Sequence, residues 1–250
     1  MDKISKAQVK LVRSLQQKKY RDESGLFVAE GEKCVEELRK GFALEYYITE
    51  NGKAASGKGS STLSATATEI EQMSGLRAPQ GVIGVFRKRD EGHATTDSLV
   101  VVLDGVQDPG NLGTIIRTCD WFGVHDIICS QDTADCYNPK VVQATMGALS
   151  RVRVHYTDLP QWMEEQSRKG IVPVFGTLLD GKDLYETVES LKPIQSGIIV
   201  MGNEGNGISQ KVRRLITHPI RIPSYPKGAE TSESLNVSIA TAVVLAEFRR

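Results

Sequence analysis

Three loops rich in glycine and asparagine hold the side chains of this sequence best suited to chemistry. The first spans residues 104–113 and ends in Asn111-Leu112-Gly113, and Arg117 follows on the next predicted helix. A glycine-rich loop ahead of a helix presents unpaired backbone amides and a positive dipole end, which favour an anion such as a phosphate. A tight turn followed by a surface arginine explains the same residues equally well, so this loop alone leaves both interpretations open.

The second loop, Gly202-Asn203-Glu204-Gly205-Asn206-Gly207, is a candidate nucleotide site. Its glycines are spaced G-x-x-G-x-G, whereas the dinucleotide fingerprint needs G-x-G-x-x-G, and the chain has no P-loop lysine. Glycines here would let the backbone approach an adenosine closely. Glu204 taken alone is better explained as a favourable charge at the N-terminus of the following helix.

The third loop runs from Ile222-Pro223 to Ser238 and leads into the last helix. Ser234 or Asn236 could simply cap that helix, and for Ser234 alone this is the favoured interpretation. The four cysteines show neither a C-x-x-C pair nor a histidine at zinc spacing, so we expect reduced, buried thiols and no metal site.

The elements around these loops alternate between strands and helices from residue 99 onward. Residues 99–103 form an apolar, β-branched run of the kind that parallel sheets bury on both faces. Further strands are predicted at 126–129, 152–154, 171–175, 197–201 and 219–223, and helices at 114–122, 139–149, 161–169, 209–215 and 236–250. This order predicts an open, mostly parallel α/β sheet, whose ligands bind beyond the carboxyl ends of the strands.

The first ninety residues are predicted to form a smaller α/β unit. We expect one basic amphipathic helix over 1–21, strands at 26–29, 46–48 and 81–86, a helix over 32–40 closed by Gly41, and a flexible loop over 51–64. The charged segment 87–98 lacks an apolar period, so we expect domains at 1–90 and 99–250 joined by a linker at 91–98.

The overall charge gives no sign of a nucleic-acid partner. Lys and Arg number 31, as do Asp and Glu, so any RNA contact must come from local clusters. The candidate contacts are Lys10, Arg13, Lys18, Lys19 and Arg21, with Lys53, Lys58 and the run 87–89 as further members. No apolar run is long enough to span a membrane and no signal peptide is evident, so we expect a cytoplasmic protein without a membrane partner.

Taken together and in order, the three loops resemble one family. The segments LDGVQDPGNLGTIIRT, IVMGNEGNGIS and IP…SESLNVSIATAVVL resemble the three motifs of the SpoU (TrmH-type) RNA 2′-O-ribose methyltransferases of the SPOUT superfamily. The resemblance implies a SPOUT domain with a deep trefoil knot, S-adenosyl-L-methionine as cofactor and a homodimer. Residues 1–90 resemble the small RNA-binding domain that often precedes it, which favours ribosomal RNA over transfer RNA as substrate.

The resemblance also implies residue roles. It assigns Met201, Gly202, Ile222, Leu235 and Asn236 to the cofactor, and Asn111, Arg117, Glu204, Ser234 and Asn236 to the polar catalytic set around the ribose. A guanidinium holds its proton far above neutral pH, so our hypothesis is that Arg117 binds a phosphate and stabilises alkoxide character while Glu204 and Asn111 orient it. One departure is the link 224–233, which is longer than usual and puts the shape of the cofactor pocket in question.

Two other classes remain as alternatives. A nucleotide-dependent Rossmann-like enzyme is disfavoured by the glycine spacing. A non-catalytic RNA-binding adaptor with a SPOUT fold is disfavoured because every catalytic position of the motifs is filled.

Overall fold

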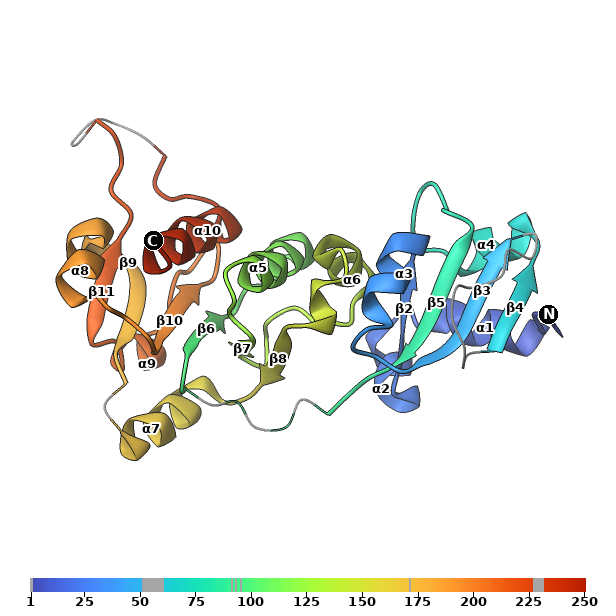
Figure 1. The fold of residues 1–250 in the computed structure, drawn as a ribbon, viewed down its shortest axis with the longest axis horizontal. Coiled ribbons are helices and arrows are strands. Elements are labelled where there is room, and N and C mark those ends of the chain that lie inside the picture. The colour runs from blue at the N-terminus through green and yellow to red at the C-terminus, as the bar shows by residue number, and fades with distance from the viewer. Residues whose placement is uncertain are drawn as a thin grey trace. The chain divides into compact units, whose positions relative to one another are not determined.

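Two compact units make up the chain (Figure 1). The computed structural model describes residues 2–50, 61–90, 92, 94, 96–170, 172–226 and 232–250. The first unit comprises Met1–Asp90 together with Asp135–Arg151, and the second comprises Glu91–Ala134 and Val152–Arg250. The longer segment of the first unit ends at Asp90, and residues 135–151, which we expected in the 99–250 domain, belong to the same unit.

The first unit is built on a five-stranded sheet in the order β1-β4-β3-β5-β2. Its strands are β1 (Asp2–Lys3), β2 (Leu26–Glu30), β3 (Leu44–Glu50), β4 (Ser61–Ala65) and β5 (Val82–Arg87), and its helices are α1 (Lys6–Ser14), α2 (Lys18–Ser24), α3 (Glu32–Leu38), α4 (Ala67–Met73) and α6 (Pro139–Thr145). Strand β5 runs antiparallel to both β2 and β3, whereas β4 runs parallel to β1 and β3.

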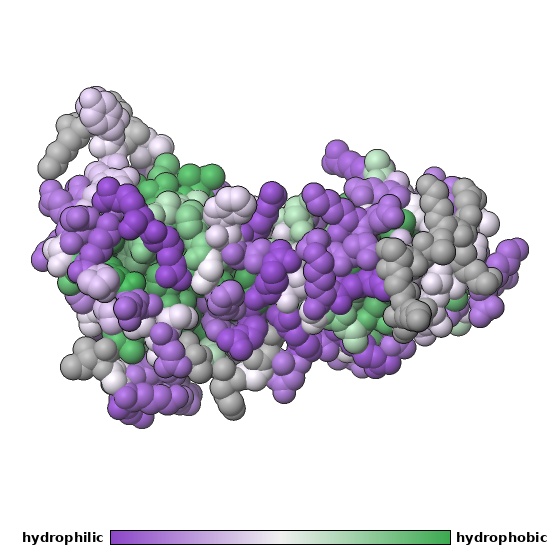
Figure 2. Space-filling view, in the orientation of Figure 1, coloured by the Kyte–Doolittle hydropathy of each residue, from purple (hydrophilic) through white to green (hydrophobic). Residues whose placement is uncertain are grey.

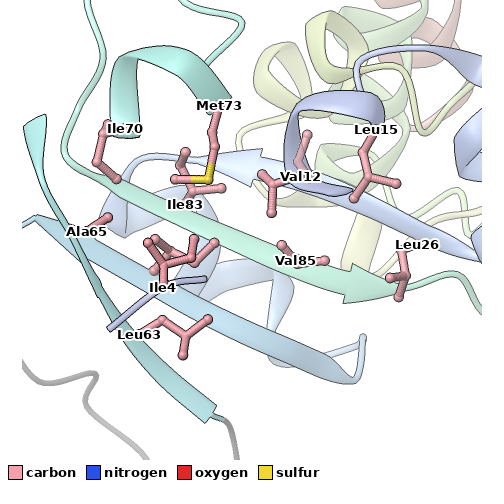
Figure 3. Packing of buried hydrophobic residues seen from close by; sticks show 12 residues of the cluster. Ile4, Val12, Leu15, Leu26, Leu63, Ala65, Ile70, Met73, Ile83 and Val85 are labelled. Carbon is pink, nitrogen blue, oxygen red and sulfur yellow. The ribbon is translucent and has the colours of Figure 1, made fainter. Parts of the chain in front are cut away.

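The core of this unit lies between the sheet and the helices α1 and α4. Figure 3 shows Val12 and Leu15 beside the sheet, with Met73 of α4 near Ile83 of β5. These side chains are almost wholly buried, and burial of an aliphatic side chain stabilises a fold by roughly 1.5–3 kcal/mol. The apolar face of α1 therefore attaches the helix to the sheet and leaves its basic face outward.

Residues 135–151 belong to this unit because they pack against β2 and α3. Asp135 pairs with the buried Arg21, and the Arg89 guanidinium donates to the carbonyls of Leu149 and Ser150 at 3.2 and 3.0 Å. Contact is close enough that a Cβ on Gly41 would lie 2.3 Å from the Ser150 carbonyl oxygen. Gly41 is thus explained by close packing rather than by the helix cap that we expected.

The second unit contains a six-stranded sheet, every pair of which is parallel, in the order β11-β9-β10-β6-β7-β8. Its strands are β6 (Leu99–Asp104), β7 (Asp126–Cys129), β8 (Arg153–Tyr156), β9 (Val174–Asp183), β10 (Gly197–Gly202) and β11 (His218–Arg221). Its helices are α5 (Pro109–Trp121), α7 (Leu159–Lys169), α8 (Leu184–Leu191), α9 (Gln210–Arg213) and α10 (Val237–Phe248). The predicted parallel α/β sheet is confirmed. The chain between β11 and α10 includes residues outside the described ones, so the knot stays a prediction.

Several local expectations are wrong for identifiable reasons. The helix over 1–21 is split, because residues 15–17 turn between α1 and α2 while Leu15 enters the core. The helix over 32–40 ends at Leu38, and the one over 139–149 ends at Thr145 because Met146 adopts φ 52°. Residues 61–64 lie in β4 rather than in a loop, and residues 51–60 lie outside the described residues. Helices α4 and α8 were not predicted.

The described part of the chain contains no helix that is both long and apolar enough to span a membrane.

Candidate active site

The first two loops leave the sheet side by side. Strands β6 and β10 are parallel neighbours, and Gly202 at the end of β10 is paired with Asp104 at the end of β6. Residues separated by nearly a hundred positions in the sequence therefore meet at one carboxyl edge, where ligands of parallel sheets bind. Asp104 strengthens the junction, because its Oδ2 accepts from the Ser209 backbone amide at 2.7 Å.

The first loop is shaped to place Asn111 in the first turn of α5. Gly105 adopts φ 76°, and its amide donates to Ser130 Oγ at 2.9 Å. Asp108 caps the helix by accepting from the Asn111 amide at 2.8 Å, and Pro109 occupies the first turn, where a missing amide proton costs nothing. Asn111 thus sits at the positive end of a thirteen-residue helix.

Asn203 holds the second loop to the first. Its Nδ2 donates to the Gly105 carbonyl at 2.6 Å, and its Oδ1 accepts from the amides of Gly205 and Asn206, both at 2.9 Å. A Cβ on Gly202 would lie 2.4 Å from the Gly207 carbonyl carbon, so this turn cannot close around a larger residue. The loop glycines therefore serve a tight turn that presents Glu204.

A chain of hydrogen bonds joins the three loops. Asn111 Nδ2 donates to Glu204 Oε1 at 3.0 Å, and Asn236 Nδ2 donates to Asn111 Oδ1 at 2.9 Å. Asn236 Oδ1 caps α10 by accepting from the Ser238 amide at 2.9 Å. The cap of α10 needs an oxygen from Asn236, and a carboxylate such as Glu204 only accepts hydrogen bonds. These two requirements determine which way the side-chain amides of Asn236 and Asn111 point.

Two residues of the expected catalytic set stand apart from this chain. Arg117 is exposed, and among the described residues it forms no hydrogen bond or ion pair. Six residues along α5 place it about 9 Å from Asn111 along the axis and roughly 120° around it. Ser234 is likewise exposed and without a hydrogen bond to any described residue. The orientation of Arg117 by Glu204 and Asn111 therefore does not occur within the described chain.

The residues expected at the cofactor surround the same edge. Met201 is buried at the end of β10, Gly202 is partly exposed, and the Leu235 side chain is 48% exposed. The backbone groups of Ile222 and Leu235 make no hydrogen bond with any described residue. Unpaired backbone groups beside an exposed apolar side chain fit the purine of S-adenosylmethionine, which can be read through main-chain donors and acceptors.

The expected RNA contacts divide into available and occupied cations. Arg21 is buried, donates to Asp135 Oδ2 at 2.6 Å and to the Leu15 carbonyl at 2.8 Å, and so cannot reach a phosphate. This corrects the expectation for Arg21. Lys18 pairs with Asp22, and Lys19 lies 3.9 Å from Glu23. Lys10 and Arg13 are exposed and form no ion pair among the described residues.

The other proposed cations are also engaged or undescribed. Arg87 pairs with Glu45 and Lys88 with Asp22, while the Arg89 guanidinium lies over the Phe42 ring. Lys53 and Lys58 lie outside the described residues.

Sequence reasoning missed the residues that fix the loops. Asp104, Asp108 and Asn203 form the junction, yet none was singled out. The Asp-Pro pair at 108–109 is a recognisable helix start, whereas nothing local marks Asn203 as a bridge to Gly105. Within the described ranges, no group of three or more His, Cys, Asp or Glu side chains could hold a metal ion.

Fold and site together define an α/β enzyme domain whose polar centre spans three loops at the carboxyl edge of a parallel sheet. Residues 98–246 match the family model described as the SpoU rRNA Methylase family, and residues 6–84 match an MRM3-like substrate binding domain. The Bacillus subtilis 23S rRNA (guanosine(2553)-2′-O)-methyltransferase RlmP is 30% identical over 245 residues, covering 96% of this chain and 95% of that protein.

Two solved structures are similar over the whole chain. A TrmH-family protein from Porphyromonas gingivalis is 36% identical with a TM-score of 0.88, covering 98% of each chain. An AdoMet-bound rRNA methyltransferase from Sinorhizobium meliloti is 29% identical with a TM-score of 0.83, covering 100% of this chain and 96% of that one. The chain belongs to the SpoU rRNA methylase family. As the motifs predict, it is an S-adenosylmethionine-dependent RNA 2′-O-methyltransferase, and the Rossmann-like alternative is set aside.

Proposed function

We propose that this enzyme methylates a ribose 2′-hydroxyl in ribosomal RNA, and that the Glu204–Asn111–Asn236 chain is the polar centre around that ribose. The observation that carries the proposal is this series of hydrogen bonds, because it joins the three family motifs. Relatives named as 23S rRNA methyltransferases, in Bacillus subtilis and in Neisseria meningitidis, support ribosomal rather than transfer RNA.

The reaction needs alignment more than acid–base power. The bound cofactor supplies an electrophilic methyl group on a sulfonium. The chain's own residues must hold the 2′-oxygen in line with that methyl group, which can lower a barrier by several kcal/mol on its own. Glu204 is exposed and keeps lone pairs free to accept from a ribose hydroxyl, and the proton released when the methyl group replaces it on oxygen passes to water at this exposed edge. Arg117 binds the neighbouring phosphate and stabilises negative charge on the oxygen, since a guanidinium does not act as a base at neutral pH.

Homodimer formation is supported by the surface of α10. This helix is apolar around its whole circumference, and Val237, Thr241 and Phe248 are buried on one side. On the other side Ile239 is 53% exposed, and Ala246 is exposed on the same face. Figure 2 shows hydrophobic residues gathered over α10. A helix apolar all round is normally covered on every side, and a second copy of this chain would cover it.

The same surface accounts for the position of Arg117. Trp121 is 84% exposed and lies one helical turn beyond Arg117 on α5, and α5 packs against α10. If Trp121 lies in the dimer interface, Arg117 lies there too and acts on the ribose bound at the partner's Glu204 loop. This arrangement replaces the orientation of Arg117 by Glu204 and Asn111 of the same chain.

Mixing two inactive variants tests this arrangement. In a heterodimer of Arg117→Ala and Glu204→Ala protomers, one site holds both wild-type side chains if Arg117 acts across the interface. Random pairing should then restore about one quarter of wild-type methyl transfer. If Arg117 acts within its own chain, every site carries a substitution and the mixture stays as inactive as its components.

The activity itself is tested by methyl transfer from labelled S-adenosylmethionine to ribosomal and transfer RNA in separate reactions, followed by nucleoside analysis. We expect label in a 2′-O-methylated nucleoside of ribosomal RNA. Arg117→Ala is the control and should retain cofactor affinity while losing transfer. A protein that binds no S-adenosylmethionine, or labels only transfer RNA, would refute the proposal.

The first unit is proposed to bind the RNA, which the match of residues 6–84 to a substrate binding domain supports. The cytoplasm is the proposed location. The four cysteines are buried thiols outside any disulfide, and burial raises the pKa of the Cys34 thiol to about 11, which suits a protein that stays reduced.

A further inference from the structure

A wide groove lies on the first unit between α1, α2 and α4. Its volume is about 1040 Å³. The groove is lined by Ala7, Lys10, Leu11, Arg13, Ser14, Gln16, Gln17, Tyr20, Glu71, Gln72 and Ser74. Most of these residues are polar in type, and their side chains bring hydrogen-bonding and charged groups to the groove.

The groove carries positive charge that nothing in the described structure neutralises. Lys10 and Arg13 are one helical turn apart on α1, both exposed and both without an ion pair among the described residues. Glu71 is the single acidic residue of the lining. By contrast, the cations at 18, 19 and 21 are engaged with carboxylates, so two of the three cations of α1 and α2 without an ion pair among the described residues line the groove, and the third is Lys6.

An aromatic ring stands beside these cations. Tyr20 is 38% exposed, and Lys19 Nζ lies 5.8 Å from the centre of its ring. Gln16 is held in place by donating to the Met73 carbonyl at 3.1 Å, and exposed amides of Gln17 and Gln72 complete the lining. An exposed ring, amides and flanking cations are the groups that bind unpaired nucleotides, since the ring stacks on a base and the cations contact phosphates.

We propose that this groove binds a single-stranded segment of the RNA substrate, with a base stacked on Tyr20 and the adjoining phosphates held by Lys10 and Arg13. The proposal rests on the proposed function, since it names the form of RNA that the first unit takes. A base within a duplex is stacked on its neighbours and cannot stack on Tyr20, so the groove selects a loop or bulge.

Fluorescence anisotropy of the full-length protein tests the groove. The probes are a labelled oligoadenylate of about ten nucleotides and the duplex formed by pairing it with its complement. Tyr20→Ala should weaken binding of the single strand by about 5- to 100-fold, whereas Tyr20→Phe should retain it because the ring is kept. Lys33→Ala, which removes an exposed cation from α3 outside the groove, is the matched control and should bind as wild type.

The salt dependence provides a second readout. Removing both Lys10 and Arg13 should reduce the slope of log affinity against log salt by about 1.4, since each phosphate contact on a single strand contributes about 0.7. Thermal unfolding of each variant establishes that the first unit is folded.

Unchanged affinity in Tyr20→Ala would overturn the proposal, and so would a duplex that binds as tightly as the single strand. Either result leaves the proposed function intact if the wild type still transfers methyl groups. Failure of the wild type to bind S-adenosylmethionine would instead refute the function, while the groove's affinity for single strands would remain measurable.

Discussion

Replacing Asn111 with aspartate reverses one donor in the chain that joins the three loops and changes little in shape. In the wild type Asn111 Nδ2 donates to Glu204 Oε1 at 3.0 Å, while Asn111 Oδ1 accepts from Asn236 at 2.9 Å. A carboxylate at position 111 still accepts from Asn236. Its other oxygen, however, faces the carboxylate of Glu204, and neither group has a proton to donate.

The magnitude follows from the geometry. A hydrogen bond to a charged group contributes about 1.5 kcal/mol at the low end of the usual range, which suits this exposed pair. Two unit charges at about 3 Å repel each other by about 1.4 kcal/mol at the dielectric constant of water. The sum of about 3 kcal/mol corresponds to roughly a 100-fold loss of methyl-transfer rate if these hydrogen bonds must be present in the transition state.

The assay is single-turnover methyl transfer with saturating RNA, with cofactor affinity measured separately by calorimetry. Asn111→Asp should lower the transfer rate by up to about 100-fold while changing cofactor affinity far less. The double variant N111D/E204Q is the decisive companion, because the glutamine amide can donate to the new carboxylate and remove the repulsion. It should transfer methyl groups faster than N111D.

Near-normal turnover in Asn111→Asp would refute the reasoning, since the direction of the hydrogen bond between residues 111 and 204 would then not matter. A double variant no faster than N111D would also count against it, because relief of the repulsion is the predicted effect.

Three further perturbations address stability and assembly. Arg21→Ala should lower the free energy of unfolding by about 3–5 kcal/mol in urea titrations, because Asp135 is left nearly buried without its partner; a loss under about 1 kcal/mol would contradict this. Burial alone would raise the pKa of Asp126, but hydrogen bonds from His155 and Arg153 outweigh it and hold the pKa below its ordinary 3.8. The carboxylate therefore stabilises the fold above about pH 4, and this contribution is lost as the pH falls through the pKa of the folded state. In thermal melts from about pH 3 to 7, the Tm of Asp126→Asn should fall less steeply toward acid pH than that of the wild type. Ile239→Glu should convert a dimer of twice 27.4 kDa into monomers by light scattering, and Leu179→Glu, at an exposed residue of β9, should leave the mass unchanged.

The elements of the second unit were predictable where the signal is local. The run at 99–103 is β-branched and apolar throughout, which is the pattern of a strand buried on both faces, and β6 is such a strand. Placing the loops at the carboxyl edge follows from strand–helix alternation alone. That Asn111 bonds to Glu204 was not predictable, because it depends on β6 and β10 being neighbours, and nothing local encodes strand order.

The errors share one physical origin, which is tertiary contact between residues distant in sequence. Arg21 sits in a run of exposed cations and has their composition, but its partner Asp135 comes more than a hundred residues later. Gly41 has the sequence position of a helix cap, yet its role depends on the Ser150 carbonyl. The family resemblance supplied the candidate site residues, but not the hydrogen bonds that join three of them.

The inclusion of Asp135–Arg151 in the first unit limits how the protein can be divided or recombined. A fragment ending at Asp90 would keep Arg21 without Asp135 and would leave β2 without α6. In a chimaera that takes only residues 1–90 from another family member, the foreign β2 would likewise have to pack against the α6 of this chain. Residues 1–90 and 135–151 therefore have to be exchanged together, and substitutions in α2 or β2 constrain those allowed in residues 135–151.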